Sequence, residues 1–131
     1  MCMKIFLFTF FILILCSGLH AQSLNCLSFR NGKFKMTING HTSVIERSGS
    51  NQKEYFINLK DSLKMSFNVK WLDDCTYTLT PTKESFEKYP QIPKNAVLTV
   101  QITSTTANSY TQSSTSNFIA KTVVGEVIKI N

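Results

Sequence analysis

Hydrophobic and polar residues alternate along most of the chain after residue 30, in short segments that turn residues separate. The clearest segment covers residues 63–71, and its apolar members are Leu63, Met65, Phe67, Val69 and Trp71. Successive side chains of a β-strand point to opposite faces of the sheet, so this period of two predicts a strand with one buried face. The spacing does not fit an amphipathic helix.

The same period predicts strands on both sides of this segment. They cover residues 33–38, 44–47, 55–59, 75–80, 97–102 and 110–116, followed by one or two strands within residues 118–130. Asn39-Gly40 is a strong hairpin signal, because both residues accept a positive φ. The residues that we expect on buried faces are Phe34, Met36, Ile38, Tyr55, Ile57, Leu59, Tyr77, Leu79, Leu98, Val100, Ile102, Ile128 and Ile130.

About eight strands with short connections predict an all-β fold, a single small antiparallel meander. A meander of this length closes into a barrel or folds into a two-layer sandwich, and the barrel could be lipocalin-like. Residues 83–95 break the alternation, and Pro90 and Pro93 prevent a long helix there. We therefore expect no helix longer than two turns in the domain.

The first 21 residues predict a secretory signal peptide. Lys4 supplies a positive start, residues 5–15 form an apolar run, and small residues follow up to Ala21. This is the order of regions in a secretory signal. The run of about 11 residues is shorter than the roughly 20 that a transmembrane helix needs. We expect an exported protein in which residues 22–131 form one domain of ordinary size.

Two cleavage sites are compatible with this signal. Cleavage after Ala21 would release a periplasmic or extracellular protein that begins at Gln22. Cleavage before Cys16 would leave a cysteine for lipidation, and the protein would then be anchored to the membrane through a lipid. Leu15 departs from the lipoprotein pattern, which has a small residue just before the cysteine.

Two cysteines, Cys26 and Cys75, remain after removal of residues 1–21. An even number of cysteines in a small exported domain predicts a disulfide. The bridge would close a loop of about 50 residues and stabilise the fold by roughly 4 kcal/mol in the chain-entropy model. The alternative is a pair of buried thiols that behave as small apolar residues.

The chain is basic, but its charges are dispersed. The formal net charge is +6, and the lysines alternate with other residues rather than forming runs. Dispersed lysines are typical of solvated strand faces, whereas a nucleic-acid interface needs a basic cluster. We therefore expect no nucleic-acid partner. The partners that stay open are an envelope protein, a glycan and a small apolar ligand.

The sequence predicts no catalytic site, no metal site and no cofactor. His41 is the one histidine after residue 21, and it follows the Asn39-Gly40 turn without a catalytic serine motif elsewhere. The spacing of His41, Cys26, Cys75 and Asp73 matches no standard zinc pattern. Paired-carboxylate hydrolysis stays open, because glutamates from distant segments could meet in the fold. These are Glu46, Glu54, Glu84, Glu87 and Glu126.

Aromatic residues recur at alternating positions of neighbouring strands. They are Phe34, Tyr55, Phe67, Trp71 and Tyr77. The simplest interpretation places all five in a packed core. If the meander closes into a barrel, the same residues could line a pocket for a small apolar ligand. Alternation is identical in a filled and a hollow barrel, so both interpretations stay open.

The segment from residue 25 to residue 80 resembles a family of short exported Bacteroidota proteins without an established function. The matching features are Cys26, Phe29, Gly32-Lys33-Phe34, Glu46-Arg47, Gln52-Lys53-Glu54 and the run Val-Lys-Trp-Leu-Asp-Asp-Cys-Thr-Tyr-Thr-Leu at residues 69–79. The resemblance implies one all-β envelope domain, often behind a lipoprotein signal, and implies no activity. Some members carry an automatic DNA topoisomerase IV label, which a short exported chain cannot support.

Residues 61–63, Asp-Ser-Leu, resemble the short acceptor motif for O-glycosylation in exported Bacteroidota proteins. Ser62 would be the modified residue. Asp-Ser is also a common turn pair, because both side chains bond to the nearby backbone. A turn between the two flanking strands therefore explains the same residues.

These observations lead to three hypotheses of function. The first is a non-enzymatic binding or structural module of the cell envelope. The second is a lipocalin-like carrier of a small apolar ligand, which an internal cavity of roughly several hundred cubic ångströms behind Trp71 would favour. The third is a hydrolase that uses two facing carboxylates.

Overall fold

The computed structural model describes residues 23–57 and 63–131. These residues form a short 3-10 helix, eight strands and one short α-helix. In chain order the elements are η1 (Cys26–Phe29), β1 (Gly32–Ile38), β2 (His41–Ser48), β3 (Asn51–Ile57), β4 (Lys64–Trp71), β5 (Thr76–Pro81), α1 (Lys83–Lys88), β6 (Leu98–Thr105), β7 (Ser109–Ser116) and β8 (Val123–Lys129).

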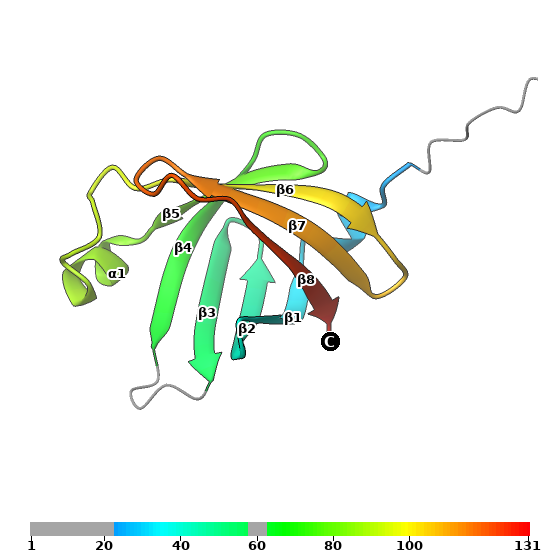
Figure 1. Cartoon of the computed structure of the whole chain (residues 1–131), viewed down its shortest axis with the longest axis horizontal. Helices are drawn as coiled ribbons and strands as arrows, with labels where there is room; N and C mark the ends of the chain where they lie inside the picture. Colours follow the sequence, from blue (N-terminus) through cyan, green and yellow to red (C-terminus); the bar gives the residue numbers. More distant parts are fainter. Residues whose placement is uncertain (1–22, 58–62) are drawn as a thin grey trace, which may run out of the picture.

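The eight strands form a closed barrel in which each strand pairs antiparallel with the next (Figure 1). The pairing of β1 with β8 closes it, with Phe34 opposite Lys129 and Met36 opposite Val127. The predicted all-β meander is therefore confirmed, and of its two forms the barrel is observed rather than the sandwich. Closure removes the exposed sheet edges that would otherwise invite aggregation.

The turn between β1 and β2 forms as predicted. Asn39 and Gly40 both have positive φ, of 50° and 77°. A two-residue turn of this kind matches the twist of the strands that it joins. It therefore sets the register in which Ile38 lies opposite His41.

Four strands bury the apolar faces that alternation predicted. The inward residues of β1, β4, β5 and β6 that belong to the core are Phe34, Phe67, Val69, Tyr77, Leu79, Val100 and Ile102, with Met36, Met65, Trp71 and Leu98 packed against them. In these strands the polar residues lie on the outer surface. Hydrophobic burial alone accounts for the way these strands face.

The predictions were wrong for β3 and β8. In β3 the inward residues include Gln52 and Glu54, so Tyr55 and Ile57 lie on the outer face, where Ile57 is 44% exposed. In β8 Ile128 is 42% exposed and Ile130, just beyond the strand, 48%, whereas Val127 is fully buried. Alternation places side chains on two faces but does not identify the inner one when both carry apolar residues.

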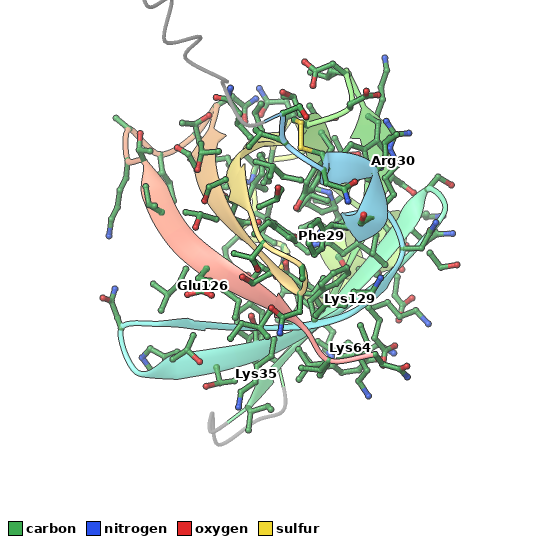
Figure 2. All side chains as sticks on the ribbon, turned by 90° about the vertical axis from the view of Figure 1, so that its right-hand side faces the viewer. Phe29, Arg30, Lys35, Lys64, Glu126 and Lys129 are labelled. Carbon is green, nitrogen blue, oxygen red and sulfur yellow. A yellow bond between two sulfur atoms is a disulfide. The ribbon has the colours of Figure 1, made fainter. Side chains whose placement is uncertain are left out.

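The two ends of the barrel differ. One end is covered by η1, and Figure 2 shows this helix across the barrel end with Phe29 inside the ring of strands. A disulfide joins Cys26 of η1 to Cys75, just before β5, which confirms the predicted bridge. At the other end lie the β1–β2 turn, the start of β6 and the start of β8.

The helix α1 packs beside β4 and β5 on the outside of the barrel (Figure 1). Its Ser85 hydroxyl accepts from the Ser66 backbone N–H at 2.9 Å and donates to the Ser66 carbonyl at 3.0 Å. Thr82 caps its first turn by accepting from the Ser85 N–H. Neither helix in the described part of the chain is long and apolar enough to cross a bilayer.

Some sequence predictions lie outside the described residues. They are the signal peptide over residues 1–21 with its lipidation site Cys16, the inward placement of Leu59, and the glycosylation site Ser62.

Candidate ligand-binding cavity inside the barrel

A buried arginine lies at the centre of a polar network inside the barrel. Arg47 is near the end of β2, opposite Gln52 on β3, and is 2% exposed. Its Nε donates to Gln52 Oε1 at 2.8 Å, and its Nη2 donates to the hydroxyls of Tyr77 at 2.8 Å and Tyr110 at 3.0 Å. The network therefore connects β2, β3, β5 and β7 across the barrel.

The surroundings of Arg47 keep it charged. Burial lowers the pKa of Arg47, but the facing phenols of Tyr77 and Tyr110 and the Glu54 carboxyl raise it more. Its guanidinium also lies 5.1 Å from the centre of the Phe34 ring and 4.6 Å from that of Tyr77. Cation–π contacts of this kind are worth more when water is excluded.

Arg47 also attaches η1 to the barrel. Its Nη1 donates to the backbone carbonyl of Phe29 at 2.7 Å. The Phe29 ring lies 5.1 Å from the Tyr110 ring and 6.4 Å from the Phe34 ring. This end of the barrel is thus filled by side chains and carries a fixed positive charge.

Beyond this network lies a cavity of about 210 Å³. It extends from the level of Tyr77 to the opposite end of the barrel, where Ile38, Leu98 and Val123 occupy the end positions of their strands. All but one of the eight strands contribute to its wall. The lining residues are Met36, Ile38, Ile45, Gln52, Glu54, Phe56, Tyr77, Leu79, Leu98, Val100, Gln112, Ser114 and Val123.

Most of the cavity wall is apolar, and its polar groups bond to one another. Gln52 Nε2 donates to Glu54 Oε1 at 3.0 Å. Gln112 Nε2 donates to the Ser114 hydroxyl at 3.2 Å, and Gln112 Oε1 accepts from the Tyr77 hydroxyl at 3.4 Å. An apolar cavity with a few oriented polar groups is the usual form of a small-molecule site.

Glu54 is the only charged residue in the cavity wall. Burial raises the pKa of its carboxyl, and the hydrogen bond from Gln52 and the charge of Arg47 oppose this only in part. The residue as a whole keeps some solvent-accessible surface, whereas its carboxyl group lies deep among protein atoms. Burial also raises the pKa of Tyr77 well above its ordinary value of 10.0, so this phenol stays neutral.

The five aromatic residues predicted as a core or pocket lining occupy different environments. Phe34, Phe67 and Tyr77 are buried in the core, and of the five only Tyr77 also lines the cavity. Trp71 is partly buried at the η1 end, where Arg30 lies 4.6 Å above its ring. The prediction was wrong for Tyr55, which lies on the outer face beneath the Lys64 ammonium.

Sequence reasoning missed four polar members of the interior, Arg47, Gln52, Tyr110 and Gln112, and considered Glu54 only as one of several glutamates for paired-carboxylate hydrolysis. Arg47 and Gln52 lie in the segments on which the resemblance rests, but the sequence assigned them no role. Their spacing contains one signal, because Gln52, Glu54 and Phe56 share one face of a strand. The sequence would have indicated this face as the inner one only without the assumption that polar residues of a strand face the solvent.

The glutamates considered for paired-carboxylate hydrolysis do not meet in the cavity. Glu46 and Glu126 lie on the outer faces of β2 and β8, and Glu84 and Glu87 belong to α1. Across residues 23–57 and 63–131, no group of three or more histidine, cysteine, aspartate or glutamate side chains is arranged to hold a metal ion.

Comparison of the chain with protein-family models, with the curated proteins and with the solved structures gave no match in any of the three.

Proposed function

We propose that this protein is a non-enzymatic binding protein whose barrel encloses a small, largely apolar ligand. The observation that carries the proposal is the cavity of about 210 Å³ at the end of the barrel opposite η1. This is the carrier hypothesis, and it makes the binding-module hypothesis more specific.

The size and the lining of the cavity support a ligand of one ring or a short chain. A dry apolar cavity of roughly 150 Å³ is enough to bind benzene. Sites for drug-sized molecules occupy about 300–1,000 Å³, which is more than this barrel offers. Apolar walls would supply most of the affinity, and Glu54, Gln112 and Ser114 would orient the ligand.

We further propose that the protein acts outside the cytoplasm. The disulfide between Cys26 and Cys75 supports this proposal, because such bonds persist mainly in oxidising compartments. Native mass spectrometry of the protein from its own host would report the cleavage site, a lipid on Cys16, a glycan on Ser62 and a retained ligand. A reduced protein that keeps residues 1–21 would contradict the proposal.

A pair of matched substitutions on β7 tests the binding function. Ser114 lines the cavity, and its neighbour Ser113 lies on the opposite face of the same strand. Ser114→Leu should fill part of the cavity and weaken binding of a small apolar probe such as toluene by about tenfold or more. Ser113→Leu adds the same side chain outside the barrel and should leave the affinity unchanged.

Titration calorimetry or ligand-observed NMR would measure both affinities. The proposal fails if toluene and other single-ring compounds do not bind to the wild-type protein. It also fails if Ser113→Leu weakens binding as much as Ser114→Leu does.

A further inference from the structure

The cavity contains one acidic group without a basic partner. Glu54 Oε1 accepts a hydrogen bond from Gln52 Nε2, which is a neutral donor. Within the described part of the chain, the ion pairs join Arg30 to Asp74, Lys33 to Glu46 and Lys83 to Glu87, and none involves Glu54. A carboxylate in apolar surroundings is costly unless a proton or a cation compensates it.

The neighbouring arginine cannot supply that cation directly. Arg47 does not line the cavity, and its guanidinium donates to Gln52 Oε1, to the Phe29 carbonyl and to the hydroxyls of Tyr77 and Tyr110. Gln52 lies between the two charges, because its oxygen accepts from Arg47 and its nitrogen donates to Glu54. This relay fixes the Gln52 amide and presents the Glu54 carboxyl to the cavity.

We propose, on the basis of the ligand-binding function above, that the cavity selects a small organic amine whose ammonium group pairs with Glu54. The amine would donate charge-assisted hydrogen bonds to the carboxylate, which are about twice as strong as neutral ones. Its apolar part would lie against Ile45, Leu79 and Val100, which line the same cavity.

An anionic ligand does not fit the same site. A carboxylate in the cavity would face Glu54, and like charges in a low-dielectric site repel strongly. Arg47, the cation whose charge lowers the pKa of Glu54, is not part of the cavity wall. The protein therefore combines a basic outer surface with an acidic binding site. The distant surface charges are screened by salt, whereas Glu54 acts at contact distance.

The titration of the groups around Glu54 is consistent with this selectivity. Burial raises the pKa of Glu54, and an ammonium ion beside it would lower that pKa again. Arg47 stays charged, because its pKa is raised. Tyr77 stays neutral, because burial raises its pKa well above 10.0. Glu54 is thus the one cavity group whose charge would respond to the ligand.

Three single-ring probes of similar shape test the proposal: benzylamine, benzyl alcohol and benzoate. Affinities for the disulfide-bonded domain would be measured at neutral pH by calorimetry or NMR titration. We expect benzylamine to bind about tenfold or more tightly than benzyl alcohol, and benzoate to bind the most weakly.

Two substitutions that each remove one negative charge test whether the preference for benzylamine depends on Glu54. Glu54→Gln should reduce the affinity for benzylamine to about that for benzyl alcohol measured on the same variant, so that the preference for the amine disappears. Glu126→Gln removes the same charge from the exposed outer face of β8 and should leave all three affinities unchanged (Figure 2). Retention of the near-native circular dichroism spectrum by both variants would show that they fold.

The outcomes separate this inference from the proposed function. Equal binding of the alcohol and the amine, or tighter binding of benzoate, overturns the amine proposal but leaves a small-ligand carrier. An amine preference that survives Glu54→Gln also overturns it. If none of the three probes binds, both the amine proposal and the carrier function fail.

Discussion

The two ends of the barrel are built from the same eight strands but have opposite chemistry. At the η1 end Arg47 is surrounded by hydrogen-bond acceptors and aromatic rings, and the disulfide attaches the helix that covers them. Two residues along β3 from Gln52, Glu54 has one neutral donor and faces the cavity that extends to the other end. Both charges are buried, but only the first is fully compensated by the protein.

This difference between the environments of Arg47 and Glu54 suggests that one charge stabilises the fold and that the other serves ligand binding. A buried charge with several partners contributes to a rigid, specific interior, because removing one partner leaves the others unsatisfied. A buried charge with few partners leaves the native state less stable than it could be, and a ligand can supply the missing partner. We therefore expect substitutions at the η1 end to affect unfolding, and substitutions at the cavity end to affect binding.

The largest effect is expected from Arg47→Ala. This change leaves the Phe29 carbonyl, Gln52 and two phenols without their donor, and it should lower the free energy of unfolding by roughly 3–5 kcal/mol. Urea titration would measure the loss. Arg30→Ala is the matched control at the same end, because it removes a partly exposed ion pair with Asp74 and a cation–π contact with Trp71, which together should contribute about 1–2 kcal/mol. If both variants lost the same amount of unfolding free energy, the buried network around Arg47 would not contribute more to stability than a surface contact.

The disulfide should have the next largest effect. Replacing both Cys26 and Cys75 by serine releases η1 and should lower the free energy of unfolding by roughly 2–4 kcal/mol. Since the cavity lies at the other end, the folded variant should bind a single-ring ligand with the wild-type affinity. Chemical denaturation would measure the free energy of unfolding, and calorimetry at low temperature would measure the affinity for the ligand. A loss of affinity that parallels the loss of stability would show that the two ends are coupled.

The smallest effect is the pH dependence caused by Glu54. Because burial raises its pKa above the ordinary value of 4.5, the carboxyl is protonated in both folded and unfolded chains below that value. As the pH rises through the folded pKa, the buried group ionises and stability is lost. Glu54→Gln should remove this loss, while the charged Arg47 and the neutral Tyr77 are the same in both proteins. Urea titration of the wild type and of Glu54→Gln across this pH range would measure the free energy of unfolding of each. If the difference between the two values stays constant with pH, the loss of stability does not come from ionisation of Glu54.

The mistakes in the sequence prediction fall where the barrel departs from a simple hydrophobic core. In β4 the inward face carries Met65, Phe67, Val69 and Trp71, and alternation identified it correctly. In β3 the inward face carries Gln52 and Glu54, so the rule that polar residues lie outside selected the wrong face. Local rules are expected to fail at functional sites, where a sequence departs from the most stable choice.

The amino-acid sequence by itself determined the strand period, the Asn39-Gly40 turn and the all-β class, because these depend on neighbouring residues or on composition, whereas it left a disulfide and two buried thiols both open for Cys26 and Cys75. Only the tertiary structure decided that the meander closes, which face of β3 and β8 lies inside, and that Arg47 and Glu54 occupy neighbouring levels of one interior. Each strand must pair with two neighbours at once in a closed barrel, and this global condition can place polar residues inside although their local pattern suggests the surface.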